Sequence, residues 1–321
     1  MRDHGGNLDW AMGRWGGSDW IDLSTGINRL PYPVGAITSE AWTALPTRTA
    51  VQGLLTAARE RYATHAPIVA LAGAQAAIQM IPRLVAPGLA RVLGPTYNEH
   101  VACLRMAGWQ VEEVTHWTGL RGADLAVLVN PNNPDGTTTK RCESLNLLSD
   151  VGRLVVDESF VDATPTSSLA PDSDRSGLII LRSFGKFYGL AGLRLGFAIG
   201  NAEDIATVTE MAGPWPVAGP AIEIGTQALR DHVWAAQTVA RLTQDAGRLT
   251  AIAADAGWLD RGGTVLFRLF AVDDAAEAQD RLARHRIWSR VFPYSNSLIR
   301  LGLPGTAEEF SRLGDALHRK R

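Results

Sequence analysis

A single lysine lies in a glycine-rich stretch between a serine and an arginine. Residues 183–196 read SFGKFYGLAGLRLG, and Ser183, Lys186 and Arg194 stand there among four glycines. Glycine is a poor helix former and lysine is a poor core residue. Glycines let a backbone come close to an anion, the serine and arginine suit a phosphate group, and a lysine amine can attack a carbonyl. The stretch therefore predicts either a surface loop or an anion site with a reactive amine.

Other polar motifs follow short apolar runs. Residues 73–75 (GAQ) follow IVAL, residues 94–97 (GPTY) follow ARVL, residues 130–136 (NPNNPDG) follow LAVLV, and Asp157 and Glu158 follow LVV. Taken alone, these motifs have ordinary interpretations as a tight turn, a rigid loop and an internal ion pair. Ligands in open α/β sheets sit at the carboxyl ends of strands, however, and a glycine turn into a helix suits phosphate.

The elements that would position these motifs can be read from the periodicity. Val, Ile and Leu runs at 68–71, 90–93, 125–129, 154–156, 178–181 and 195–200, with a more polar one at 110–115, predict strands. Runs without alternation indicate strands buried on both faces of a mostly parallel sheet, and helical patterns lie between them. After helical stretches at about 220–255, we expect strands at 264–270, 287–292 and 298–302 and helices at 273–285 and 306–319. Residues 1–35 are interpreted as an extended segment fixed by Trp10, Trp15 and Trp20.

One ligand, pyridoxal phosphate, explains all the motifs. Its aldehyde requires an amine, which Lys186 offers as a Schiff base, and its ring nitrogen requires a carboxylate, which Asp157 offers. The remaining requirements are backbone and side-chain groups for the phosphate, a donor for the phenolic oxygen and an aromatic ring against the pyridine face. We assign these roles to Ala74, Gln75, Ser183 and Arg194 for the phosphate, Asn133 for the phenolic oxygen and Tyr97 for the ring.

With these residues the chain resembles the fold-type I pyridoxal-phosphate enzymes of the class I/II aminotransferase group. The motifs NPNNPDG, DES and SFGKFYGLAGLRLG carry the resemblance, which covers nearly the whole length. It implies an α/β fold, with a large domain built on a mainly parallel seven-stranded sheet and a smaller α+β domain. It also implies a homodimer with the site at the subunit interface.

Within this group the chain is most similar to the threonine-phosphate decarboxylases of cobalamin biosynthesis. The similarity lies in HGGN at residues 4–7, DLSTGIN at 22–28 and PTYNEH at 95–100. It implies decarboxylation of L-threonine O-3-phosphate to (R)-1-amino-2-propanol O-2-phosphate. The resemblance assigns Arg300 to the substrate carboxylate and Arg290 to the substrate phosphate, with His4 and Asn28 as further substrate contacts. Histidinol-phosphate aminotransferase, a close relative, is the alternative.

Two positions depart from the pattern of the group. Where many relatives have a tyrosine that bonds the phenolic oxygen, this chain has Phe160, so Asn133 must do more of that work. Where relatives place a tyrosine before a proline, from the neighbouring subunit, on the cofactor phosphate, this chain has Leu45 before Pro46. We therefore expect a phosphate site that is weaker or is completed by other residues.

Composition narrows the partners and the location. The formal net charge is −2 and the charged residues make up 20% of the chain, which predicts no nucleic-acid or membrane partner. A regulator that uses such a domain as a ligand sensor would need a basic DNA-binding module, which residues 1–40 do not offer. Two cysteines without metal-ligand spacing favour a reducing compartment, the cytoplasm, and no metal. The basic residues 318–321 are interpreted as a helix end.

The chain of 321 residues is long enough for more than one domain. We expect an N-terminal arm at 1–43 that belongs to a small domain, a large cofactor-binding domain at 44–213, and linker helices with the rest of the small domain at 214–321. The break at residues 213–220 (GPWPVAGP) sets the second limit.

Overall fold

The computed structural model describes residues 4–318, so the basic residues 319–321, expected to end a helix, lie outside the described part. The chain forms two compact units, which we call the large unit and the small unit. The large unit contains residues 32–133 and 138–234, and the small unit contains the residues up to 31, 134–137 and those from 235 onward. The domain limits expected from the sequence, after residues 43 and 213, stay a prediction.

The large unit is built on a mixed sheet, which confirms the α/β fold class expected from the sequence. Within the described residues this sheet has seven strands in the order β2-β8-β7-β6-β5-β3-β4, and only β8 runs against its neighbours. Every residue of β5 and β8 is buried, as their unbroken apolar sequences predict. The strands are β2 (Ile68–Leu71), β3 (Leu89–Leu93), β4 (Gln110–Val114), β5 (Leu125–Val129), β6 (Arg153–Asp157), β7 (Leu178–Ser183) and β8 (Gly196–Gly200).

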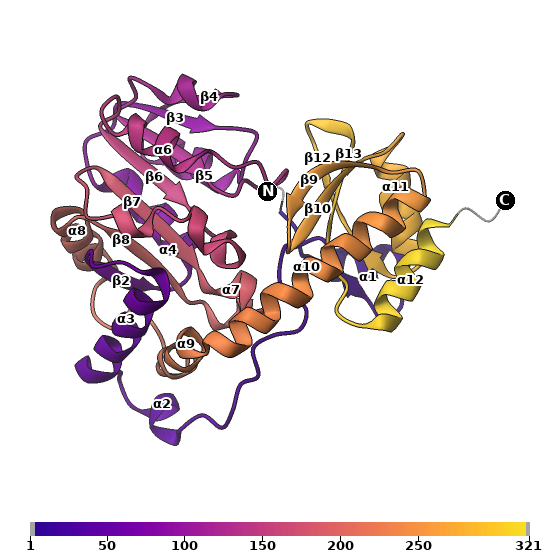
Figure 1. The fold of residues 1–321 in the computed structure, drawn as a ribbon, viewed down its shortest axis with the longest axis horizontal. Coiled ribbons are helices and arrows are strands. Elements are labelled where there is room, and N and C mark those ends of the chain that lie inside the picture. The colour runs from indigo at the N-terminus through magenta and orange to yellow at the C-terminus, as the bar shows by residue number, and fades with distance from the viewer. Residues whose placement is uncertain (1–3, 319–321) are drawn as a thin grey trace. The chain divides into compact units, whose positions relative to one another are not determined.

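Helices pack on this sheet, among them α3, α4 and α8 (Figure 1). Side-chain oxygens at the helix starts accept backbone N–H groups that would otherwise lack partners: Thr47 caps α3 and Asn201 caps α8. The helices of this unit are α2 (Ser39–Thr43), α3 (Arg48–Tyr62), α4 (Ala74–Met80), α5 (Glu99–Met106), α6 (Arg141–Leu147), α7 (Phe184–Phe187), α8 (Ala202–Ala212) and α9 (Gly219–Arg230).

The small unit contains a four-stranded antiparallel sheet, in the order β12-β13-β10-β9, and the short parallel pair β1-β11 among its described residues. Helix α10 (His232–Asp255) begins in the large unit and continues through the small one. The other elements are α1 (Leu8–Trp15), β1 (Ile21–Asp22), β9 (Leu259–Thr264), β10 (Phe267–Ala271), α11 (Ala275–Arg284), β11 (Ile287–Trp288), β12 (Arg290–Phe292), β13 (Ser295–Gly302) and α12 (Ala307–Leu317).

Three parts of the small unit differ from the expectation. Residues 8–15 form helix α1, not an extended segment, because Ala11 is buried against Trp288 and Leu8 and Trp15 pack on the same cluster. These three positions follow helical spacing, while the spacing of the tryptophans alone concealed it. The strand expected at 264–270 is β10, and residues 259–264 (LDRGGT), where no strand was expected, pair with it as the edge strand β9. An exposed, glycine-containing edge strand lacks the apolar alternation that marks a strand. The single strand expected at 287–292 is divided into β11, which pairs with β1, and β12, which pairs with β13.

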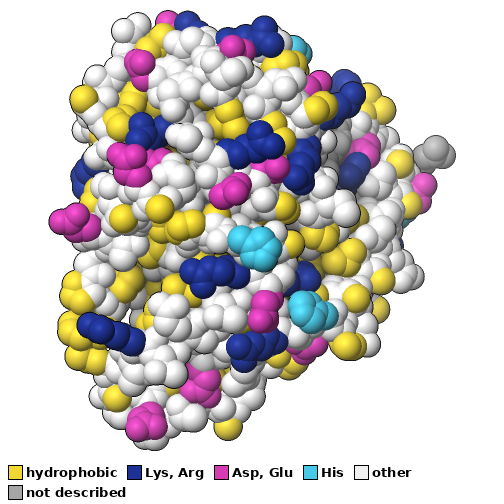
Figure 2. Space-filling model, turned by 60° about the vertical axis from the view of Figure 1, so that its left-hand side comes forward, with side chains coloured by type: hydrophobic (Ala, Val, Ile, Leu, Met, Phe, Trp, Pro, Cys, Tyr) yellow, Lys and Arg dark blue, Asp and Glu magenta, His cyan; other side chains and the backbone are white. Residues whose placement is uncertain are grey.

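The surface carries charges of both signs. Figure 2 shows one face of the molecule, on which Lys and Arg side chains are interspersed with Asp and Glu and with hydrophobic side chains. In the described part of the chain, none of the helices combines the length and the apolar character that a membrane crossing requires.

Candidate active site

A cavity of about 170 Å³ opens in the large unit where its parallel strands end. Val129, Asp157 and Ser183, the last residues of β5, β6 and β7, line it. All the residues assigned to the cofactor on sequence grounds lie on its wall. They are Ala74, Gln75, Tyr97, Asn133, Asp157, Ser183, Lys186 and Arg194.

Asp157 carries its charge in a buried position. Its Oδ2 lies 2.9 Å from Nε2 of His100, and its Oδ1 accepts hydrogen bonds from the amide (3.0 Å) and the hydroxyl (2.5 Å) of Ser159. Burial acts to raise the pKa of Asp157, but the hydrogen bonds and charge of His100 and the bonds from Ser159 outweigh it and lower that pKa below its ordinary value. The carboxylate is therefore ionised at neutral pH.

Sequence reasoning missed His100. This residue is buried at the start of α5 and holds Asp157 from the side of β3. The available signal was its position in PTYNEH, in the first turn of a helix that follows a strand ending at the same sheet edge. A buried carboxylate needs such a donor, and polar residues that follow neighbouring strand ends are the candidates for it.

Glu158, next to Asp157, points to a different partner. Its carboxylate accepts a hydrogen bond from Nη1 of Arg182 at 3.0 Å and from the hydroxyl of Ser168 at 2.6 Å, and Arg182 also bonds Asp162. All these side chains are buried. The internal ion pair considered for this dipeptide thus belongs to Glu158, while Asp157 faces the cavity.

Lys186 lies on α7, a single helical turn directly after β7. Phe184 and Phe187 on the same turn are fully buried, and a Cβ at Gly185 would lie 2.8 Å from Cα of Ala191. This close packing fixes the turn, and Nζ of Lys186 lies 5.7 Å from the centre of the Phe160 ring. Phe160 itself lines the cavity.

Two glycines shape the end of the cavity near Arg194. Gly73 has a φ of +79°, and a Cβ there would lie 2.6 Å from Nη2 of Arg194. A Cβ at Gly196 would lie 2.3 Å from the amide nitrogen of Ala74. The turn into α4 therefore reaches the start of β8 and the arginine closely, which places backbone N–H groups and a guanidinium at one end of the cavity, as an anion site needs.

Tyr97 and Gln75 are bonded to each other on the cavity wall. The hydroxyl of Tyr97 donates to Oε1 of Gln75 at 3.2 Å, and Nε2 of Gln75 donates to Oε2 of Glu99 at 3.1 Å. Burial, followed by the charges of Glu99 and Asp157, raises the pKa of Tyr97 to about 12. Tyr97 is therefore a neutral hydrogen-bond donor, and its ring faces the cavity uncharged.

The three asparagines of NPNNPDG have different roles. Asn130 exchanges two hydrogen bonds with the backbone of Thr139, and Asn132 bonds the hydroxyl of Thr96 and the carbonyl of Pro95. These two side chains hold the loop, and Asn133 is the one that lines the cavity.

The small unit brings two predicted substrate residues together. Arg290 and Arg300 are directly opposite each other on β12 and β13. Arg300 is buried, and its Nη2 donates to the carbonyl oxygen of Ser24 at 2.7 Å. Burial, with the nearby charge of Arg290, lowers the pKa of Arg300 to about 10. Two adjacent cations in a desolvated place favour the binding of an anion.

Asn28 and His4, the other two, are also in the small unit but differ in exposure. Asn28 is buried, and its Oδ1 accepts hydrogen bonds from Nη2 of Arg241 at 2.7 Å and from the amide of Leu30 at 3.1 Å. His4 is exposed.

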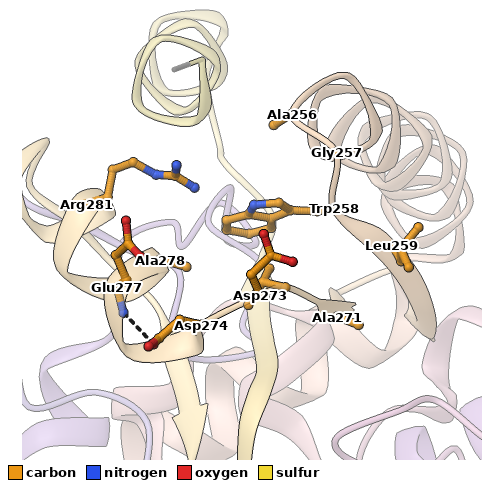
Figure 3. A pocket seen from close by; sticks show the side chains of 11 residues that line it. Ala256, Gly257, Trp258, Leu259, Ala271, Asp273, Asp274, Glu277, Ala278 and Arg281 are labelled. Carbon is orange, nitrogen blue, oxygen red and sulfur yellow. Dashed lines mark hydrogen bonds between the residues drawn. The ribbon is translucent and has the colours of Figure 1, made fainter. Parts of the chain in front are cut away.

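A second cavity, of about 180 Å³, lies in the small unit (Figure 3). Trp258, Asp273, Glu277 and Arg281 line it, and the amide of Glu277 donates to the carboxylate of Asp274 there. None of the residues predicted for the site belongs to its wall. Among residues 4–318 there is also no group of three or more His, Cys, Asp or Glu side chains that could hold a metal ion.

Comparison with known proteins identifies the family of this chain. A sequence profile of aminotransferase class I and II matches residues 43–317. The chain belongs to the aminotransferase class I and II family. Within this family it is 42% identical to a threonine-phosphate decarboxylase from Pseudomonas aeruginosa, over 99% of this chain and 97% of that protein. A histidinol-phosphate aminotransferase from Shewanella oneidensis is 30% identical over 70% of this chain and 63% of that protein.

The fold agrees with the family. The crystal structure of histidinol-phosphate aminotransferase from Sinorhizobium meliloti, in complex with pyridoxal-5'-phosphate, is similar with a TM-score of 0.83. The two chains are 20% identical, and the similarity covers 96% of this chain and 92% of that one. A seven-stranded sheet in one unit and a small antiparallel sheet in the other are therefore the fold of this aminotransferase family, as expected from the motifs.

Proposed function

We propose that this chain is a decarboxylase of L-threonine O-3-phosphate that uses pyridoxal phosphate as its cofactor. The observation that carries this proposal is the near full-length similarity to a threonine-phosphate decarboxylase, in a chain whose cavity joins a lysine, a charged carboxylate and an anion site. Histidinol-phosphate aminotransferase, the alternative, is supported by a similarity that covers a smaller share of both chains. The product, (R)-1-amino-2-propanol O-2-phosphate, would serve cobalamin biosynthesis.

The residues of the cavity fit pyridoxal phosphate. Gly73 and Gly196 leave room where a Cβ would collide, so that the backbone of residues 73–75 and Arg194 can surround a phosphate. Lys186 supplies a primary amine for the aldehyde, and the Asp157 carboxylate is ionised, as a partner for a protonated ring nitrogen must be. Tyr97 offers a neutral aromatic ring, and Asn133 offers an amide donor for the phenolic oxygen.

When bound, the cofactor supplies an electron sink for the bond that breaks at the substrate Cα. Asp157, held by His100 and Ser159, keeps a negative charge that retains a proton on the ring nitrogen. Decarboxylation replaces the bond from Cα to the carboxylate by a bond to hydrogen, so a proton must be delivered. Lys186 is the residue we assign to that transfer.

Decarboxylation and transamination differ in which bond to Cα is cleaved. Residues that orient the substrate therefore decide the outcome, without any new catalytic group. We assign the substrate carboxylate to Arg300 and its phosphate to Arg290, because the planar guanidinium matches both anions. His4 and Asn28 are proposed as further substrate contacts.

We also propose that the enzyme is a homodimer of the cytoplasm. Trp42 in α2 and Trp215 just before α9 are 70% and 54% exposed. Helices α2 and α9 are in contact, since a Cβ at Gly219 in α9 would lie 2.2 Å from the carbonyl oxygen of Ala41 in α2. Large apolar side chains exposed in one region indicate a protein interface. Two cysteines without a disulfide, Cys103 and Cys142, agree with a reducing compartment.

The experiment that tests the function compares two substrates. The purified protein, loaded with pyridoxal phosphate, is incubated with L-threonine O-3-phosphate and, separately, with histidinol phosphate and 2-oxoglutarate. We expect release of carbon dioxide from the first and no glutamate from the second. Glutamate formation with histidinol phosphate, without carbon dioxide from threonine phosphate, would establish the aminotransferase instead.

A further inference from the structure

Arg300, the residue we assign to the substrate carboxylate, is held by a backbone group of the N-terminal segment. Its Nη2 donates to the carbonyl oxygen of Ser24. Because Arg300 is buried and lies opposite Arg290, which repels it, a fixed acceptor is needed to keep its guanidinium in one orientation. The carbonyl oxygen of Ser24 is such an acceptor.

The same serine holds the start of the chain. Its Oγ accepts a hydrogen bond from the amide of Gly6 at 2.6 Å, and Nε1 of Trp288 donates to the carbonyl oxygen of Gly6 at 2.8 Å. A Cβ at Gly5 would lie 2.3 Å from the Ser24 carbonyl oxygen, which is also the acceptor of Arg300. The segment 5–6 and the guanidinium of Arg300 therefore meet at one peptide group.

Ser24 itself is rigidly placed. Its side chain donates to Oδ1 of Asp22 at 2.6 Å, its amide donates to the same oxygen at 2.9 Å, and it is 1% exposed. Both backbone groups of the preceding residue, Leu23, are hydrogen-bonded as well. Its amide donates to the carbonyl oxygen of Trp288, and its carbonyl oxygen accepts from the amide of Gly302. With its one proton directed to Asp22, the hydroxyl presents a lone pair to Gly6, which an alanine cannot do.

We propose that Ser24 is a positioning residue that keeps the segment 4–7 and Arg300 at a fixed spacing for the substrate. Its hydroxyl holds the segment that carries His4, and its carbonyl oxygen holds the arginine. This inference rests on the proposed function, since it assumes that Arg300 and His4 contact threonine phosphate. The spacing of the two groups would then set how the substrate's two anionic ends are held relative to each other.

The test uses Ser24→Ala, with Ser289→Ala as a matched control. Ser289 is a buried serine of the same unit whose Oγ has no hydrogen-bond partner within the part of the chain that the structure describes. Hydrogen exchange of the loaded enzyme is measured at the amide of Gly6, and steady-state kinetics are measured with threonine phosphate. We expect Ser24→Ala to accelerate exchange at Gly6 and to raise KM about tenfold, about 1.4 kcal/mol, with kcat within about threefold. Ser289→Ala should change neither.

Two further variants separate positioning from general stability. Ser24→Thr keeps the hydroxyl and should keep KM within about threefold of the wild type. If Ser24→Ala does not fold, Ser24→Cys, of similar size but with a weak donor and acceptor, is expected to show the same rise in KM. A lower apparent kcat at unchanged KM would mean a merely structural role and would overturn the proposal, as would unchanged exchange at Gly6. If the wild type releases no carbon dioxide, the proposed function fails, while the exchange measurement still tests the contact of Ser24 with Gly6.

Discussion

At the scale of single residues, the carboxylate of Asp157 receives hydrogen bonds from His100 and from Ser159. Burial alone would favour its protonated form, so the charge that the cofactor needs depends on these neighbours. The position of Asp157 could be predicted from the sequence because it ends an apolar strand. The identity of its donor could not, because His100 comes from another strand end and only the fold brings the two together.

Replacing Asp157 by asparagine should leave the fold intact and lower turnover by several orders of magnitude. The amide has nearly the same shape but cannot retain the proton on the ring nitrogen. Circular dichroism and cofactor content serve as controls for folding and loading. Turnover within about tenfold of the wild type, or about 1.4 kcal/mol of barrier, would contradict the assignment.

His100 should affect how stability depends on pH. The pKa of Asp157 in the folded protein is lowered, so its contribution to stability is present above the pKa of the unfolded chain, about 3.8, and is lost as pH falls through the folded value. In His100→Phe, burial is opposed by fewer donors and the folded pKa rises. The loss of stability on acidification is then expected to begin at a pH at least about one unit higher than in the wild type.

The measurement is the urea midpoint of both proteins between pH 3 and 7. His65→Phe, at an exposed histidine of the same unit, is the control and should follow the wild type. Parallel curves for His100→Phe and the wild type would show that His100 does not govern the charge of Asp157.

At the scale of elements, the strand-to-helix turns build the cavity. The turn from β2 into α4 needs Gly73 for two reasons, its φ of +79° and the closeness of Arg194. The turn from β7 into α7 places Lys186 between two buried phenylalanines. Glycines in these turns could be predicted to have a function, but the atoms that they accommodate belong to elements distant in the sequence.

Gly73→Ala should weaken binding of pyridoxal phosphate by at least about tenfold, because the new Cβ displaces the Arg194 guanidinium. Gly213→Ala is a matched control, since Gly213 has a similar φ of +69° and nothing within 4 Å of the added Cβ. Both variants should lose about 1–3 kcal/mol of stability, because the backbone at each position combines a positive φ with an extended ψ, which is adopted almost only by glycine. Cofactor titration followed by absorbance separates the two effects, and equal affinities of the two variants would refute the role of Gly73.

Strands buried on both faces were predicted well because their sequences are unbroken apolar runs. Strand β9 was missed because Gly262 and Gly263 and its charged residues resemble a loop. Helix α1 was missed because Trp10, Trp15 and Trp20 are spaced by five residues, which is not a helical period. In both cases long-range partners, not local propensity, decide the structure.

At the scale of the whole molecule, the residues assigned to the cofactor and those assigned to the substrate belong to different units. The large unit holds every residue assigned to the cofactor, and the small unit holds those assigned to the substrate. The motifs at strand ends predicted the cofactor residues, and the resemblance to threonine-phosphate decarboxylases predicted the substrate residues. Motifs do not report hydrogen bonds, so the engagement of Asn28 by Arg241 and of Arg300 by Ser24 could not be foreseen.

Trp42→Glu should convert the proposed dimer into a monomer. The side chain is 70% exposed, so the charge should not disturb the fold of one subunit but would be buried in an interface. Leu259→Glu, at an exposed leucine of the small unit, is the control and should stay dimeric. Sedimentation measures the mass of each variant, and a wild type that sediments as a monomer would refute the proposal.

The neighbouring carboxylates Asp157 and Glu158 also constrain how this gene can change. They face opposite sides of the sheet, one toward the cavity and one toward Arg182. Side chains alternate along a strand, so inserting or deleting a single codon within residues 153–156 would turn each acid to the other face. The catalytic face and the buried ion network would be damaged together. We therefore expect natural or engineered length variation near this strand to be confined to the segments before residue 153 and after residue 162.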